Sequence, residues 1–162
     1  MSNIINNLNI SPFARDILND AHQIATIMQH EFIMPEHFMM AISSYCNFAD
    51  GNNRFGDKFE RLSEEISKIL NELIPQVDEE TEPTLSSLMN KAITDARKVI
   101  QYEGDVPVPA AAIVIAILNT TECLCNSIFA KYVSDKEISE IISFIMTLDG
   151  KSLRGHDLAR SS

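Results

Sequence analysis

The stretch HEFIMPEHFMMAI, residues 30–42, decides how the first half of the chain folds. Pro35 suits the first turn of a helix, where its missing N–H would have no partner, and Glu36 complements the positive end of the helix dipole. Phe38 and the aliphatic residues after it provide a face for burial. We expect a helix that begins at Pro35 and packs against its neighbours.

Other amphipathic helices flank this stretch. Ser11-Pro12 has the pattern of an N-cap followed by proline, and apolar residues then recur at helical spacing to about His30. Turn-forming residues dominate 50–56 and leave room for only a short helix. Residues 57–73 are again amphipathic. The first half therefore has the pattern of a four-helix unit.

The second half of the chain copies the first. The acidic segment DEETEP separates the halves, and Thr84 follows it as a suitable N-cap. The apolar spacing of residues 85–100 matches the first helix at an offset of 71 residues, whereas residues 108–117 match the second helix at an offset of 75. We therefore expect four extra residues in the loop around Gly104.

Two further helices complete the copy. They are expected at residues 122–132 and 135–148, and Ser134 with Glu137 forms a capping box at the start of the last one. Each unit is too small to bury its own apolar face. The sequence therefore predicts an all-α fold of about eight helices, built from two four-helix repeats that pack with pseudo-twofold symmetry.

The expected boundaries follow from this pattern. One domain spans residues 1–150, with repeat one at about 11–76, an acidic linker at 78–83 and repeat two at about 84–148. Residues 151–162 are polar and are expected to form a flexible tail or the start of a linker.

Composition narrows the classes of function. Lys and Arg total 13 against 23 Asp and Glu, a net charge of -10 that repels phosphate backbones and favours protein partners over nucleic acid. The longest apolar run, residues 106–118, falls short of the ~20 residues that span a bilayer. The odd number of cysteines and the lack of a signal peptide favour the cytoplasm. We expect a monomer with protein partners.

The sequence lacks the motifs of catalysis. It contains neither G-x-x-x-x-G-K-[ST] nor G-x-G-x-x-G, so we expect no ATPase and no other enzyme. The C-x-C pair at 123–125 has the wrong spacing for a zinc knuckle. His30 and His37 with Glu31 or Glu36 leave a surface metal site open, as in a metal hydrolase. No three ligands share one helical face, so we expect no metal and no cofactor.

Two motifs resemble the Clp N-terminal domain family. Residues 30–42 are similar to its pattern of a turn and helix cap followed by Glu-His and a run of aliphatics. EETEPTLSSLMNKAI, residues 79–93, resembles the acidic linker and the Pro-Thr-Leu-Ser start of the second repeat, most like the ClpA type. With the duplication, the resemblance covers residues 13–148.

The resemblance implies a non-enzymatic domain that is tethered to a Clp AAA+ unfoldase, an ATPase. Such a domain receives substrates directly or through an adaptor. In the ClpA type the adaptor is ClpS, and the parent chain pairs with the ClpP protease. Regulated proteolysis is the process that this resemblance implies.

The resemblance also implies which residues bind the adaptor. They are acidic positions in the first interhelical turn and at the second helix start, here Glu31 and Glu36, together with Thr84. Carboxylates there offer charge-assisted hydrogen bonds to a partner's lysines or N–H groups. Two positions depart from the family pattern. Met34 replaces a frequent threonine cap, and Ala111 replaces the second acidic site of a phosphoarginine reader, which argues against that activity.

Alternatives remain open. Glu36 and Thr84 also suit purely structural roles at helix starts. Unfolded substrates could bind directly in an apolar groove between the repeats, where methionines give adaptable contacts: Met28, Met34, Met39 and Met40. The chain could also be a stand-alone Clp-N-like regulatory protein, since the residues after 148 suit a linker or a C-terminus equally.

Overall fold

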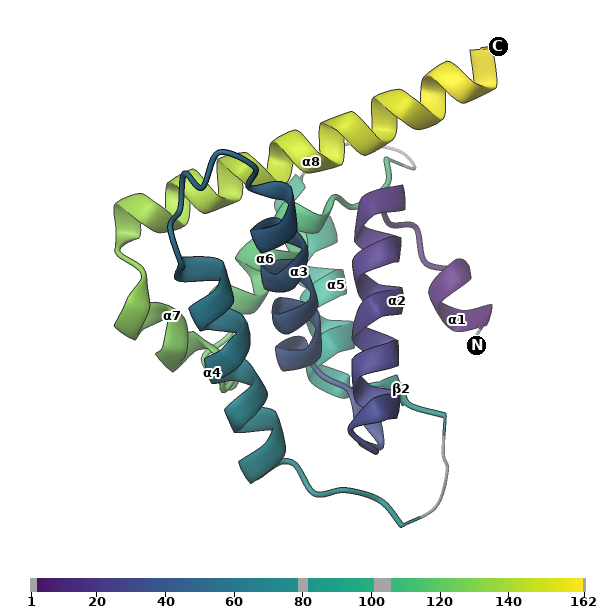
Figure 1. The fold of residues 1–162 in the computed structure, drawn as a ribbon. Coiled ribbons are helices and arrows are strands. Elements are labelled where there is room, and N and C mark those ends of the chain that lie inside the picture. Colours follow the sequence, from purple (N-terminus) through teal and green to yellow (C-terminus); the bar gives the residue numbers. More distant parts are fainter. Residues whose placement is uncertain (1–2, 79–81, 101–105, 162) are drawn as a thin grey trace.

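The computed structural model describes residues 3–78, 82–100 and 106–161, and its architecture is a helical bundle (Figure 1). The first half contains α1 (Asn3–Asn6), α2 (Pro12–Ile27), α3 (Pro35–Ala49) and α4 (Lys58–Leu73). The second half contains α5 (Ser87–Ile100), α6 (Ala110–Leu118), α7 (Asn126–Tyr132) and α8 (Asp135–Ser161). Two short strands, β1 (Phe32–Ile33) and β2 (Thr84–Leu85), precede α3 and α5. The predicted all-α fold is confirmed.

Several helix starts follow the local chemistry of the sequence. Ser11 Oγ accepts a hydrogen bond of 3.0 Å from Ala14 N at the start of α2, and α3 begins at Pro35. The predicted capping box before α8 is also formed. Ser134 N donates to Glu137 Oε1 at 3.1 Å, and Glu137 N donates to Ser134 Oγ at 3.2 Å.

The prediction that Thr84 caps the second repeat is wrong. Thr84 lies in β2, where it pairs with Phe32 of β1 in a parallel ladder. Ser86 caps α5 instead, because its Oγ accepts a hydrogen bond of 3.0 Å from Met89 N. Thr84 therefore pairs with a strand of the other repeat, and the helix starts two residues later than the sequence alone suggested.

The two repeats have the same spacing. The first helices begin at residues 12 and 87 and the second helices at residues 35 and 110, an interval of 75 residues in both cases. The predicted offset of 71 residues for the first helix is therefore wrong, and the loop around Gly104, where four extra residues were expected, lies outside the described residues. A shift of four residues is close to one helical turn of about 3.6 residues, so the apolar pattern of the first helix matches almost equally well at either offset.

A parallel backbone pairing repeats with the same interval. Ile33 of β1 pairs with Leu85 of β2, and an isolated parallel bridge joins Ile10 to Val108. Adding 75 to Ile10 and Ile33 gives Leu85 and Val108, so each pairing maps onto the other. The pseudo-twofold symmetry thus includes the segments that lead into the helices.

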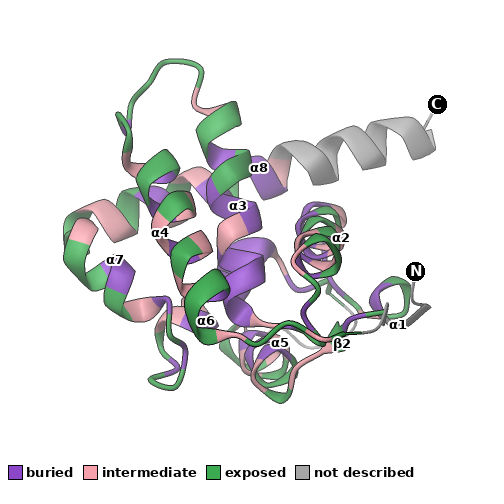
Figure 2. Ribbon diagram, turned by 60° about the horizontal axis from the view of Figure 1, so that its bottom comes forward, coloured by how far each residue is buried: buried purple, intermediate pink, exposed green. Residues whose placement is uncertain are grey.

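The core is centred on α3 and α6. Figure 2 shows buried residues concentrated on these helices, with exposed residues on the outer faces of α2 and α4. The first five residues of each central helix, from Pro35 and from Ala110, are all buried. Packing joins α3 to α2 and α4, and α6 to α5 and α8.

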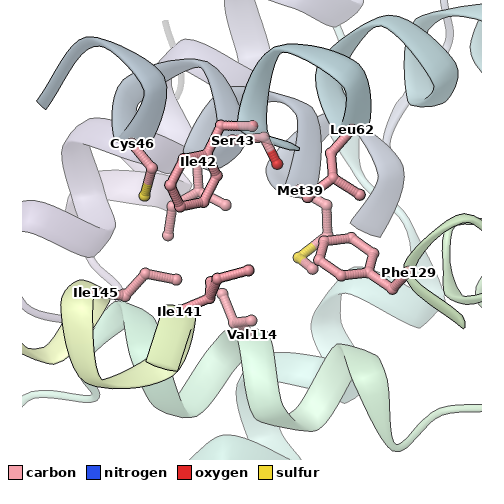
Figure 3. Close-up of a pocket in the computed structure, with 10 residues that line it drawn as sticks. Met39, Ile42, Ser43, Cys46, Leu62, Val114, Phe129, Ile141 and Ile145 are labelled. Atoms are coloured by element: carbon pink, nitrogen blue, oxygen red, sulfur yellow. The ribbon is translucent and has the colours of Figure 1, made fainter. Parts of the chain in front are cut away.

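A small cavity shows that the repeats share one core. Side chains from α3 and α4 meet side chains from α6, α7 and α8 around a space of about 10 Å³ (Figure 3). This volume is near the minimum that holds one water molecule. The repeats therefore share one core, and the interface between them has no room for a larger ligand at this place.

The extent of α3 differs from the prediction. α3 continues to Ala49 and residues 50–57 form turns, so the short third helix expected there is absent from repeat one. Residues 151–161 have helical backbone, and their role as a flexible tail or the start of a linker stays a prediction. Gly150 lowers helix propensity by about 1 kcal/mol without preventing a helix. Residues 79–81 of the acidic linker lie outside the described part of the chain.

Helix length and hydropathy also bear on membrane insertion. None of the helices in the described part of the chain is both long enough and apolar enough to cross a bilayer. The sequence-based expectation rested on the length of the apolar run at 106–118, most of which forms α6. That helix is buried within the protein core.

Candidate protein-docking surface

The structure brings two of the three predicted partner-binding residues together. Thr84 N donates a hydrogen bond of 3.3 Å to Glu31 O, and both residues are exposed. Ser86 N donates to Ile33 O at 3.0 Å one step further along. We name residues 31–33 and 84–86 the docking ribbon. It joins backbone from the two repeats, and Glu31 and Thr84 are both exposed on it.

The docking ribbon is attached to the core by alternate side chains. Ile33 is 1% exposed, whereas its neighbour Phe32 is 43% exposed. This alternation is the period of two that a strand imposes. Leu85 packs against the core from the second strand. The ribbon therefore has a fixed position, with Phe32 exposed on the face opposite Ile33.

Hydrogen bonds also fasten the turn that precedes the ribbon. Gln29 has a φ of 60°, in the left-handed region, and reverses the chain after α2. Val77 N donates to Gln29 O at 2.8 Å, and Gln76 Nε2 donates to Met28 O at 3.3 Å. The segment after α4 is thereby tied to this turn.

Exposed apolar side chains lie at the same end of the molecule. The C-terminal end of α2 lies beside β2, and the C-terminal end of α4 lies at the same end of the bundle (Figure 1). Their last residues, Ile27 and Leu73, are 81% and 60% exposed. Together with Phe32 they give this end apolar contact area in addition to the carboxylate of Glu31.

Glu36, the third predicted partner-binding residue, does not offer its carboxylate to a partner. It is 1% exposed, and its Oε2 accepts a hydrogen bond of 3.1 Å from Cys125 N of repeat two. Its Oε1 is buried without a hydrogen-bond partner. The prediction is corrected for a physical reason: the loop before α7 covers the start of α3, so Glu36 connects the repeats instead.

Two buried histidines flank the docking ribbon in the chain. His30 Nδ1 lies 2.9 Å from His37 Nε2, and Met34 N donates to His37 Nδ1 at 2.8 Å. Because His37 Nδ1 is an acceptor, the proton of the neutral ring is on Nε2, which donates to His30 Nδ1. Burial lowers the pKa of His30, and burial with the neighbouring His30 lowers the pKa of His37 to about 3.

This geometry does not favour the metal-hydrolase alternative. The two imidazoles bond to each other, Glu31 faces solvent and Glu36 bonds to Cys125 N. Across the described residues, no group of three or more His, Cys, Asp or Glu is placed to hold a metal ion. Burial also raises the pKa of Cys125 well above its usual range.

The methionines expected to line a groove are divided between core and surface. Met39 is 0% exposed and belongs to the shared core, while Met28, Met34 and Met40 are half-buried. A different apolar pocket of about 230 Å³ lies at the start of α6. Its apolar walls come from Ile100, Val106, Pro107 and Pro109.

A buried carboxylate that the sequence did not single out lies beside this pocket. Asp149 is 8% exposed; its Oδ1 accepts hydrogen bonds from Ser11 Oγ at 2.8 Å and Ala110 N at 3.1 Å, and its Oδ2 accepts from Ala111 N at 3.2 Å. Burial raises the pKa of Asp149, against the opposing effect of these hydrogen bonds. Asp149 on α8 thereby joins the start of α2 to the start of α6.

Comparison with known families agrees with this architecture. A sequence model of the family described as the Clp repeat (R) N-terminal domain matches residues 9–132. The chain therefore belongs to the Clp repeat N-terminal domain family. No curated protein matches the chain significantly.

Solved structures share the fold. The Hsp104 N-terminal domain from Candida albicans is 21% identical with a TM-score of 0.61, over 90% of this chain and 91% of that chain. A chain from preliminary structural investigations of a malarial protein secretion system is 19% identical with a TM-score of 0.61, over 83% and 92%. A chain from a study of the ATPase ClpV, the TssB-TssC sheath and the HsiE protein of type VI secretion is 17% identical with a TM-score of 0.58, over 94% and 96%. These likenesses concern the fold alone.

Proposed function

We propose that this chain is a protein-docking domain of a ClpA-like unfoldase and that a ClpS-type adaptor binds it at the docking ribbon. The observation that carries the proposal is the position of Glu31 and Thr84. The resemblance to the ClpA type implies both residues in adaptor binding, and they lie side by side, exposed, on a ribbon fixed to the core. A parent chain with ATPase modules, paired with ClpP, would then degrade what the adaptor delivers.

Charge supports a basic partner for this surface. Neither residues 16–53 nor residues 69–90 contain a lysine or an arginine, and these two segments supply both strands of the docking ribbon. Exposed carboxylates in them include Glu31, Glu72 and Asp78. Electrostatic complementarity favours a partner that presents lysines or arginines, around an apolar contact to Phe32.

Calorimetry with a purified ClpS-type adaptor tests the proposal. We expect micromolar or tighter binding by the parent chain. Glu31→Ala and Thr84→Ala should each weaken it by about 1 to 3 kcal/mol, the range for losing a hydrogen bond that involves a charged group or leaves a partner unsatisfied. Glu140→Ala removes an exposed carboxylate from α8 and serves as the matched control. Absence of binding, or equal weakening by the control, would overturn the proposal.

A second candidate is direct binding of an apolar segment of an unfolded substrate. The pocket of about 230 Å³ at the start of α6 favours it, since its walls are formed by isoleucine, valine and proline side chains. Binding of a labelled apolar peptide, followed by fluorescence anisotropy, should be lost in Val106→Asp. Val99→Asp changes an exposed valine of α5 that is not part of the pocket wall and should have no effect. Equal binding by Val106→Asp would eliminate this candidate.

A further inference from the structure

The two buried histidines enclose the first strand of the docking ribbon in the sequence. We propose that the His30–His37 pair is a proton-sensitive latch, which holds the docking ribbon in its observed conformation and releases it when either ring takes up a proton. The consequence for partner binding rests on the proposed function, whereas the latch itself does not.

Both hydrogen bonds of the latch require neutral rings. His37 Nε2 donates to His30 Nδ1, and His37 Nδ1 accepts from Met34 N. A proton added to His30 Nδ1 would place two N–H donors 2.9 Å apart. A proton added to His37 Nδ1 would oppose the N–H of Met34 in the same way. Protonation at either acceptor nitrogen therefore breaks one of the two bonds.

The latch is connected to the docking ribbon through the backbone. Residues 31–33 lie between the two histidines, and Met34 N is itself bonded to His37. Glu31 O and Ile33 O accept the hydrogen bonds that hold the second strand, from Thr84 N and Ser86 N. Loosening of the turn would therefore disturb both strands, including the exposed Glu31 and Thr84.

Charged groups near the latch do not neutralise an added proton. On α3, Glu36 directs Oε2 to Cys125 N of repeat two; in the ribbon, Glu31 is exposed; before β2, Glu82 lies 3.7 Å from His22 of α2. Among the described residues, no hydrogen bond or ion pair joins the carboxylate of Glu31 or Glu36 to either ring. His30 and His37 are 1% and 0% exposed, so a charge on either would be buried. The proton is therefore taken up when the turn opens.

Only repeat one has this pair. Ala112 stands 75 positions after His37, at the equivalent place on α6, and it has no side chain that can accept a hydrogen bond. The N–H groups at the start of α6 are bonded by Asp149 instead. The proton response should therefore be confined to the docking ribbon and its turn.

Hydrogen exchange tests the latch without any partner. Protection factors, corrected for intrinsic exchange, are measured for the amides of residues 28–34 and 84–86 between pH 7.5 and 5.0. With an ordinary histidine pKa of 6.5 in the opened turn and a pKa of about 3 in the closed one, His37 should lower protection about 30-fold, and the lowered pKa of His30 should add to this fall. Amides of α6 exchange only through global unfolding and should stay better protected than the ribbon amides at every pH, which separates local release from global unfolding.

Glutamine variants supply the controls. The double variant His30→Gln with His37→Gln removes both titrating groups, and glutamine at the third helical position can still accept from the N-cap N–H. The double variant should abolish the pH dependence of amide protection. His37→Gln alone should remove the part that His37 contributes, a change of about 30-fold between pH 7.5 and 5.0. His22→Gln removes a histidine outside the latch and should behave as the parent. A parent whose protection does not depend on pH, or a double variant with an undiminished response, would overturn the latch.

Adaptor binding at pH 7.5, 6.5 and 5.5 tests the functional consequence. Binding by the parent should weaken with acidification more than binding by the double variant, which reports any titration of the adaptor itself. Equal weakening of the two would refute regulation of binding by the latch. If the adaptor fails to bind at pH 7.5, the proposed function fails, while the exchange experiment still decides whether the latch exists.

Discussion

The N-termini of α3 and α6 occupy equivalent places in the two repeats, yet different chemistry satisfies them. At α3, His37 from the same helix accepts a hydrogen bond from Met34 N and donates one to His30 Nδ1. At α6, Asp149 accepts from Ala110 N and Ala111 N across 39 and 38 positions of sequence. One end depends on neutral local imidazoles and the other on a distant carboxylate, so the two repeats should respond differently to substitution and to pH.

The largest effect is expected at the start of α6. Asp149→Ala leaves the hydroxyl of Ser11 and two backbone N–H groups without their acceptor. We expect the free energy of unfolding to fall by about 3 kcal/mol, the upper part of the range for removing one partner of buried hydrogen bonds. Urea unfolding followed by circular dichroism measures it. Asp149→Asn, which keeps one acceptor oxygen, should cost less; a negligible effect of Asp149→Ala would show that the distant carboxylate is not needed.

The second prediction concerns pH. The folded-state pKa of His37, about 3, lies below its ordinary value of 6.5, so the unfolded chain binds the extra proton first as the pH falls. Stability from this ring is complete above pH 6.5 and decreases toward pH 3, by about 1.4 kcal/mol per unit for one proton. Unfolding at pH 7.5 and 5.5 should show this loss in the parent and less of it in His37→Gln. Equal losses in the two proteins would contradict the assignment to His37.

Asp149 should act in the opposite direction. Burial raises its pKa above the ordinary 3.8, so its contribution is greatest below that value and is lost as pH rises through the raised pKa. The difference between parent and Asp149→Asn should therefore shift with pH in the sense opposite to that of His37→Gln. If the stability differences caused by Asp149→Asn and His37→Gln changed with pH in the same direction, the two helix starts would not differ in their pH response.

The equivalent N-caps give a smaller contrast. Ser11→Ala and Ser86→Ala each remove a cap, which costs about 1 kcal/mol. Ser11 also donates to Asp149 Oδ1 at 2.8 Å, so its substitution should cost more. Thermal unfolding of the two variants measures the difference. A larger cost for Ser86→Ala would indicate that the link to Asp149 contributes nothing.

The smallest effect is expected at the turn after α2. Gln29 has a φ of 60°, where glycine avoids the steric cost of a side chain. Gln29→Gly should stabilise the protein by about 0.5 kcal/mol, and Gly104 already stands 75 positions later in the sequence. Chemical unfolding of the variant checks the sign. Destabilisation would mean that the glutamine side chain is needed in this turn.

Local signals explain what the sequence predicts well. The helix starts at Ser11-Pro12, at Pro35 and at Ser134 depend on groups three or four positions away, and the structure forms all of them. The pseudo-twofold arrangement was also predicted, because apolar periodicity repeats along the chain. Its register was wrong by about one helical turn, since periodicity alone hardly distinguishes such a shift.

Contacts between distant residues explain what the sequence did not predict. Glu36 bonds Cys125 N across 89 positions, and Asp149 bonds Ala110 N across 39. Thr84 pairs in a strand with Phe32 of the other repeat. No local sequence pattern predicts these partners, because they are far apart in the chain. Of the three predicted docking residues, the two that lie on an exposed ribbon remain candidates, and the buried one has a structural role.

Chemical-shift mapping tests the central claim most directly. The isotope-labelled chain would be titrated with a ClpS-type adaptor, and amide shifts followed at the docking ribbon and at the equivalent Ile10–Val108 bridge. The expected result is saturable shifts at residues 31–33 and 84–86, with the bridge unaffected. The largest shifts at the bridge, or none at the ribbon, would contradict the assignment of docking to Glu31 and Thr84.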